Sequence, residues 1–322
     1  MKKSLIAFLA AALMAASLAG CQNTPDNSSS GSSSAGTTTS ASSTVPQITE
    51  DLAGNPITVP QKADKIISLA ASNTDILVAL GLEDKLVAID TYSTSIEGAP
   101  TDVPQFDQMT PDTEQIIAQH ADVVFVSGMS NLNGEDVFKP VRDAGICVAE
   151  IPSANSVEEI KKSILFIGNV TGQTEKAQTL VDSMQSEIDK IKQAVASVTE
   201  KKTVYFEIGS EPALYTFGTD TFLNEMIEIV GAKNVFADQS SWISVSEEAV
   251  ITANPDVIFT NAGYMADPVG DVLSRSNWSG IAAVKNKQVY YIDNNASSLP
   301  SHNIIKALQQ MAKAVYPDLY KD

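Results

Sequence analysis

The side chains best suited to contact a ligand follow the predicted strands of this chain. Turns after strands are where α/β lobes present ligand contacts. Aromatic rings recur at these turns in both halves, although each ring taken alone is equally compatible with a place in the core. Rings on two sides of a cleft suit a large, rigid and partly apolar ligand. The candidate contacts are Ser72, Asn73, Tyr92, Phe106, Asp107, Met129, Tyr215, Phe217, Trp242, Tyr264 and His302.

The small number of arginines limits the class of ligand that we expect. The chain contains only Arg142 and Arg275, and both lie on predicted helices, away from these turns. Receptors for anionic catecholate or citrate-type siderophores are expected to meet the ligand with guanidinium groups. A near-neutral corrinoid or hydroxamate chelate therefore fits better. Haem stays open, with a Tyr or His as iron ligand.

Catalytic chemistry has little support in the sequence. The chain has 2 histidines, His120 and His302, and no acid–base pair stands out among its 39 carboxylates. His120 precedes a strand on an apolar-periodic segment, which favours a structural role. Serine-hydrolase, zinc-protease and Walker motifs are missing from the sequence. Zinc or manganese would require several imidazoles. We therefore expect no enzyme, no metal site and no resident cofactor, and the net charge of −18 argues against nucleic acid as a partner.

Two glutamates occupy matching places in the two halves. Glu114 lies eight residues before the strand that begins at Asp122, and Glu248 lies eight residues before the strand that begins at Asp256. This echo indicates two duplicated lobes, although two ordinary helix–strand units would give the same pattern. A carboxylate in the first turn of a helix also favours the helix dipole without any further role.

The N-terminus is typical of an exported protein. Lys2 and Lys3 precede an apolar run from Leu5 to Ala19, which is too short for a membrane span and fits a secretory signal over 1–20. Cys21 ends a stretch that resembles the bacterial lipoprotein box, so we expect it to be acylated. The Ser/Thr-rich stretch over 21–48 cannot bury enough apolar surface to fold and predicts a disordered tether. Cys147 is then left in a buried strand without a disulfide partner.

Short apolar strands alternate with helices along the remaining chain, as expected of an α/β fold. Strands are predicted near 65–70, 86–90, 122–127, 146–151, 203–208, 256–260 and 288–293. Helices are predicted near 74–80, 135–144 and 301–316. A longer helix from about Thr174 to Val198 carries one apolar stripe with steps of four and three residues.

The order and spacing of these segments resemble those of the cobalamin and iron-siderophore substrate-binding proteins. The run from Ile67 to Gly81 resembles the first strand, turn and helix of that family, and segments 121–125 and 255–259 and the long helix also match. The resemblance extends from about Lys62 to Tyr316. It implies two Rossmann-like α/β lobes, over 49–172 and 200–322, joined by one long rigid helix over 173–199, with the ligand cleft between the lobes.

The same resemblance implies a function. Such a protein is the class III receptor of an ABC importer, here a monomer that is lipid-anchored outside the cytoplasmic membrane and delivers its ligand to a permease dimer with its ATPase. Tyr92, Tyr215 and Trp242 fall closest to the ligand-contacting aromatic positions of cobalamin-binding relatives, whereas the match near Phe106 and Asp107 is looser. Glu114 and Glu248 match the acids that meet arginine pockets on the permease. We expect a corrinoid ligand, with a ferric hydroxamate siderophore or haem as the alternative, and an extracellular enzyme or adhesion lipoprotein as the competing class.

Overall fold

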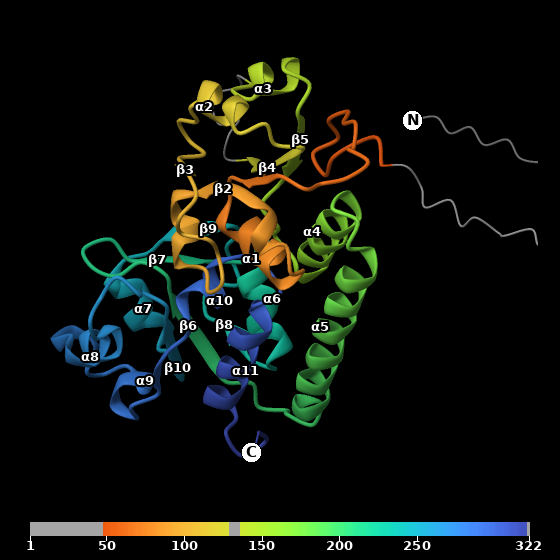
Figure 1. Ribbon diagram of the computed structural model, residues 1–322. Helices are drawn as coiled ribbons and strands as arrows, with labels where there is room; N and C mark the ends of the chain where they lie inside the picture. The colour runs from red at the N-terminus through yellow and green to blue at the C-terminus, as the bar shows by residue number, and fades with distance from the viewer. Residues whose placement is uncertain (1–47, 129–135, 321–322) are drawn as a thin grey trace, which may run out of the picture. The chain divides into compact units, whose positions relative to one another are not determined.

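The computed structural model of the protein describes residues 48–128 and 136–320. Within them, the first lobe is built on a five-stranded sheet in which every neighbouring pair of strands is parallel. The strand order is β3-β2-β1-β4-β5 (Figure 1). Their bounds are Gln105–Phe106 (β3), Leu86–Asp90 (β2), Ile66–Ser68 (β1), Val123–Ser127 (β4) and Cys147–Ile151 (β5).

The second lobe repeats this plan with a four-stranded parallel sheet in the order β11-β10-β6-β8. The bounds are Val289–Tyr291 (β11), Val257–Thr260 (β10), Thr203–Glu207 (β6) and Lys233–Asn234 (β8). A separate antiparallel pair, β7 (Tyr215–Phe217) with β9 (Trp242–Ser244), follows the carboxyl end of β6. The sequence predicted loops at β7 and β9, and the structure corrects this to two short strands.

Helices cover both sheets. In the first lobe they are α1 (Ala71–Ala79), α2 (Thr113–Ala118), α3 (Lys139–Asp143) and α4 (Val157–Val170), with the short 3-10 turns η1 (Glu83–Lys85) and η2 (Thr91–Ser95). In the second lobe they are α6 (Phe222–Ile229), α7 (Glu247–Ala253), α8 (Pro268–Ser274), α9 (Ala282–Lys285), α10 (Asn294–Ser298) and α11 (Ile304–Val315), with the 3-10 turn η4 (Ser276–Trp278).

The strands alternate between two cores because each sheet is covered on both faces. Val123 and Phe125 face the core that also contains α4, whereas Val124 and Val126 face the core beneath α2 and α3. In the second lobe Phe206 points inward in the same way, while Tyr205 faces the core that contains Trp278. The inward-facing side chains of both lobes belong to one continuous hydrophobic cluster.

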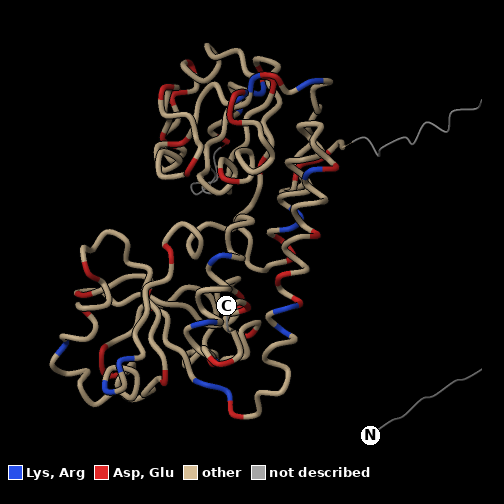
Figure 2. Tube along the Cα trace, turned by 60° about the horizontal axis from the view of Figure 1, so that its bottom comes forward, with Lys and Arg blue, Asp and Glu red and all other residues tan. Residues whose placement is uncertain are grey.

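The long helix α5 (Thr174–Val195) connects the two lobes in sequence and packs against both. It lies beside α4 of the first lobe and contacts α6 and α11 of the second (Figure 1). The predicted apolar stripe is confirmed, and its buried members are Ala177, Val181, Met184, Ile188, Ile191 and Val195. Acidic and basic residues are distributed along the rest of the helix (Figure 2). The stripe therefore anchors one rigid element in the shared core.

A pair of aspartates shows that the two lobes are built alike. Asp122 Oδ2 accepts hydrogen bonds from the backbone N–H groups of Asp64 and Lys65, at the start of β1. Asp256 Oδ2 accepts from the backbone N–H and the hydroxyl of Thr203, at the start of β6. Each aspartate immediately precedes the strand that pairs with β1 or β6. The echo that the sequence indicated is thus a repeated structural unit.

Cys147 begins β5 and is buried, as predicted. Burial raises the pKa of its thiol to about 11, with a further contribution from the charge of Asp51. The thiol is a packing group in the hydrophobic cluster at the centre of the fold.

Candidate functional site

Four of the predicted ligand contacts are large aromatic side chains that are exposed. Tyr92 follows β2 and is 71% exposed, and Tyr264 follows β10 and is 72% exposed. Tyr215 and Trp242, on β7 and β9, are each 40% exposed. Single exposed rings are normal on a protein surface, and rings gathered on one face are what mark a binding site. The first lobe contributes one ring and the second lobe contributes three.

Three expected contacts are buried, and their contact with a ligand stays a prediction. Phe217 is fully buried and packs edge-to-face on Phe206, so its side chain belongs to the core. Phe106 and Asn73 are also buried, the former in the cluster beneath α2 and α3. Position along a strand did not distinguish buried from exposed side chains, since Tyr215 and Phe217 share one face of β7 and only Tyr215 is exposed.

Phe217 nevertheless contacts one of the exposed rings, that of Trp242. It lies directly opposite Trp242 in the β7–β9 pair, and the two ring centroids are 6.0 Å apart at 76°. This edge-to-face contact holds the indole from the buried side and leaves its other side open. Ser72 is half-buried, and Asp107 is exposed, with its carboxylate accepting from the Met109 backbone N–H and the Thr110 hydroxyl. Met129 lies outside the described residues.

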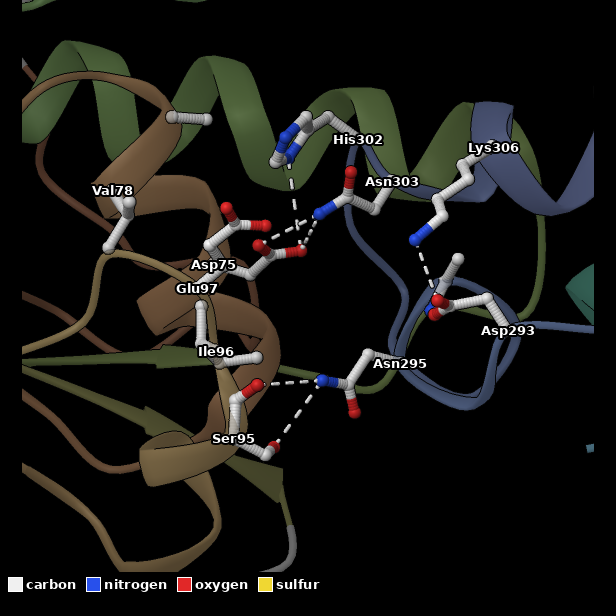
Figure 3. A pocket seen from close by; sticks show the side chains of 12 residues that line it. Asp75, Val78, Ser95, Ile96, Glu97, Asp293, Asn295, His302, Asn303 and Lys306 are labelled. Carbon is white, nitrogen blue, oxygen red and sulfur yellow. Dashed lines mark hydrogen bonds and ion pairs between the residues drawn. The ribbon is translucent and has the colours of Figure 1, made fainter. Parts of the chain in front are cut away.

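A polar pocket of about 460 Å³ lies where the two lobes meet (Figure 3). Asp75 of α1 points across it toward residues that precede α11. Its carboxylate accepts a hydrogen bond of 2.5 Å from the Ser301 hydroxyl and bonds of 2.9 and 3.0 Å from the Asn303 amide. Close by, the Asn295 amide donates to the Ser95 carbonyl at 3.0 Å. Direct hydrogen bonds between the lobes therefore run along this pocket.

His302, a predicted ligand contact, lines this pocket and not the aromatic surface. Its Nδ1 is 3.9 Å from Asp75 Oδ2 and has no hydrogen-bond partner among the described residues. Burial lowers the pKa of His302, and the charge of Asp75 partly opposes this effect. The pocket is lined by carboxylates and amides and suits solvent or a small polar molecule rather than a macrocycle.

Arg275 departs from its expected peripheral position. It follows α8 and is buried, with two hydrogen bonds of 2.6 and 2.9 Å to the Glu207 carboxylate and another of 2.6 Å to Asp271. Arg142 donates to Asp136 on the surface of the first lobe. Both arginines are thus committed to carboxylates of the chain itself.

Glu114 and Glu248 occupy the same position in equivalent helices. Each is the second residue of its helix, after an Asp112 or Ser246 cap whose side chain accepts a backbone N–H. Both glutamates are exposed. Hydrogen bonds from its own backbone N–H and from the Ser246 hydroxyl lower the pKa of Glu248. The structure confirms the matching placement, and their contact with a permease stays a prediction.

Sequence reasoning missed the contacts that depend on distant parts of the chain. Nothing in the sequence around Asp75, Glu207 or Arg275 indicated their partners. The polar residues between Asn294 and Asn303, which line the side of the pocket that belongs to the second lobe, were visible as a polar run in the sequence. In the described ranges, no helix has both the length and the apolar character needed to cross a membrane, and no three acidic, His or Cys residues are grouped as metal ligands.

Comparison with known proteins identifies the family to which this fold belongs. A family model described as periplasmic binding protein matches residues 66–296. The chain belongs to the periplasmic binding protein family. It is 34% identical over the full length of both chains to the uncharacterized ABC transporter substrate-binding lipoprotein YvrC of Bacillus subtilis. The predicted recognition and fold are confirmed, and the protein is a substrate-binding protein of the ABC-importer type.

Two further similarities bear on the ligand of this family member. The chain is 26% identical to a cobalamin-binding protein of Halobacterium salinarum, over 84% of this chain and 74% of that relative. A solved structure from Staphylococcus epidermidis, described as a possible iron-binding periplasmic solute-binding protein, is 32% identical with a TM-score of 0.69, covering 80% of this chain and 100% of that one.

Proposed function

We propose that the protein captures a corrinoid outside the cytoplasmic membrane and delivers it to the permease of an ABC importer. The observation that carries this proposal is the set of exposed rings, Tyr92, Tyr215, Trp242 and Tyr264, drawn from both lobes. Flat rings stack on or surround a rigid macrocycle at low entropic cost, because a Tyr or Trp side chain has few rotatable bonds. Similarity to the cobalamin-binding relative supports the same ligand class.

The pairing of both arginines within the chain supports a ligand that has no exposed carboxylates. Arg275 is held by Glu207 and Asp271, and Arg142 is paired with Asp136. Neither guanidinium is available for the bidentate contacts that anionic ligands favour. The corrinoid is therefore preferred over haem, whose propionates would lack such partners.

A ferric chelate is the second candidate, because the 32% identical solved protein is described as iron-binding. Titration calorimetry of the purified full chain with cyanocobalamin, haem and ferrichrome separates the two. Micromolar or tighter binding of cyanocobalamin alone is expected. Preferential binding of ferrichrome or haem would reassign the ligand, and binding of none would reject the proposed surface.

The remaining parts of the proposal concern placement and partners. Acylated Cys21 would hold the protein on the membrane, and the stretch over 21–48 would act as a tether; the similarity to a lipoprotein supports this. Glu114 and Glu248, one on each lobe, would meet equivalent sites on the two halves of a permease dimer. A role in transport, and not in catalysis, agrees with the family.

A further inference from the structure

A buried ionic cluster lies at the carboxyl end of β6. Glu207, the last residue of β6, receives two hydrogen bonds from Arg275, whose guanidinium also lies 4.4 Å from the ring centroid of Trp278. Asp271 of α8 accepts from the same guanidinium. Removing either side of such a pair would leave an uncompensated buried charge, so the cluster is rigid.

The cluster is connected to the backbone of the adjoining turn through Ser210. Arg275 Nη2 donates to the Ser210 hydroxyl oxygen at 2.6 Å, and that hydroxyl lies 3.3 Å from Asp271 Oδ2. Ser210 is itself buried. Its backbone N–H is consequently held in a fixed direction.

That N–H donates to the phenolic oxygen of Tyr264 at 3.0 Å. Tyr264 lies 54 positions along the chain from Ser210, in the turn after β10, and 72% of its surface is exposed. An exposed tyrosine is ordinarily free to change rotamer. Here the ring is held at both ends, by its own backbone and by its oxygen, while most of its surface stays open.

We propose that Arg275 and Ser210 are positioning residues for ligand binding, which act by fixing the ring of Tyr264 in the orientation that contacts ligand. This inference rests on the proposed function of the aromatic surface. A ring that is already immobile loses less conformational entropy when a flat ligand packs on it, and binding is tighter by that amount. The buried cluster thus explains why this part of the site is ordered before ligand arrives.

The test is a mutant cycle on the purified full chain, with cyanocobalamin as the probe and calorimetry as the measurement. Tyr264→Phe removes the accepting oxygen and keeps the ring, and Ser210→Ala breaks the link to Arg275. Arg275 keeps Glu207 and Asp271 as acceptors in Ser210→Ala, so that variant should fold. Each change is expected to raise Kd about three- to tenfold while the variant stays folded under the conditions of the titration, as its urea transition shows.

Two further variants distinguish positioning from general packing. The double variant should bind no more weakly than the weaker single variant, because both changes break one connection. Ser210→Thr, which keeps the hydroxyl, should restore affinity to within about twofold of wild type. Wild-type affinity in both single variants, additive losses, or a Ser210→Thr variant as weak as Ser210→Ala would each overturn the inference. If wild type binds neither cyanocobalamin, haem nor ferrichrome, the proposed function itself fails and the positioning role is rejected with it.

Discussion

Asp75 and Asn303 are 228 positions apart in the chain, and the Asn303 amide lies within 3.0 Å of both oxygens of the Asp75 carboxylate. Ser301 adds a third hydrogen bond to the same carboxylate. Asp75 belongs to the first lobe, and its two partners belong to the second (Figure 3). Asp75 and Ser301 are buried and Asn303 is half-buried, so the loss of one partner leaves buried polar atoms with fewer hydrogen bonds. This contact therefore helps to fix the angle between the lobes.

The contact predicts a measurable coupling between the two residues. In a double-mutant cycle of Asp75→Ala and Asn303→Ala, the free energy of unfolding in urea should show a coupling of about 0.5–3 kcal/mol. The exposed pair Lys139–Asp143 is the matched control and should couple by about 0.3–0.5 kcal/mol. A coupling at Asp75 no larger than that of the control would show that the lobes do not make this contact in solution.

His302 predicts a specific dependence of stability on pH. Its pKa is lowered by burial, so the unfolded chain binds this proton more readily than the folded protein. Its contribution to the free energy of unfolding is therefore complete above about pH 6.5 and is lost as pH falls toward the folded pKa. Asp75, Glu97, Asp293 and Lys306 face the same pocket and are unchanged in the His302→Gln variant, so their contributions are common to the two proteins that are compared.

Urea unfolding at about pH 7.5 and about pH 5 tests this dependence. Wild type should lose more stability between the two conditions than His302→Gln. His120→Asn is the control, because His120 is exposed with a φ of 51°, a conformation that Asn tolerates. Equal losses in wild type and His302→Gln would contradict the prediction.

Trp242 and its buried neighbour Phe217 should respond to truncation in opposite ways. Trp242→Ala removes an exposed ring and should weaken cyanocobalamin binding by about 1–3 kcal/mol with little change in thermal stability. Phe217→Ala opens a cavity in the core and should cost about 3–5 kcal/mol of stability. Early melting of Trp242→Ala with unchanged affinity would place Trp242 in the core instead.

Charge reversal at Glu114 and Glu248 should abolish transport and leave ligand binding unchanged. The double variant Glu114→Lys/Glu248→Lys should abolish cobalamin uptake in cells and leave the Kd unchanged. Glu158→Lys/Glu175→Lys is the matched control, because these are exposed carboxylates in the first turns of α4 and α5 with the same change in net charge. Both double variants lose favourable helix-dipole contacts of about 0.3–1 kcal/mol per site. Normal uptake in the Glu114→Lys/Glu248→Lys variant would leave the two glutamates with that local role alone.

Lipidation of Cys21 predicts that the protein is found in the membrane fraction. Cys21→Ser removes the acceptor for the lipid and should release the protein from the membrane fraction into the soluble extracytoplasmic fraction, detected by immunoblot. Ligand affinity should not change, because the described body begins well after this residue. Persistent membrane association of Cys21→Ser would argue against lipidation as the anchor.

The fold was largely predictable because its signals are local. The buried run Leu86–Asp90 has the bounds predicted for it, and the apolar stripe of α5 follows directly from its spacing. Glu114 and Glu248 were found through a repeated interval, which reflects the repeated unit around Asp122 and Asp256.

The site was less predictable because its contacts join distant segments. Phe217 and Trp242 are neighbours only through the β7–β9 pairing, so sequence did not reveal that one is buried and the other exposed. Arg275 was placed on a predicted helix away from the ligand-facing turns, whereas its partner Glu207 lies 68 positions away. Such pairings are set by tertiary packing, and residue type alone does not indicate them.

The burial of Cys147 has a consequence for the chemistry of this protein. Only the thiolate reacts readily with oxidants and alkylating reagents, and a pKa of about 11 leaves on the order of one thiol in ten thousand ionised at neutral pH. Cys147 in the folded body is therefore expected to react slowly with oxidants and alkylating reagents. A cysteine introduced on either lobe would be the one that a maleimide probe modifies, since the native thiol is both protonated and covered.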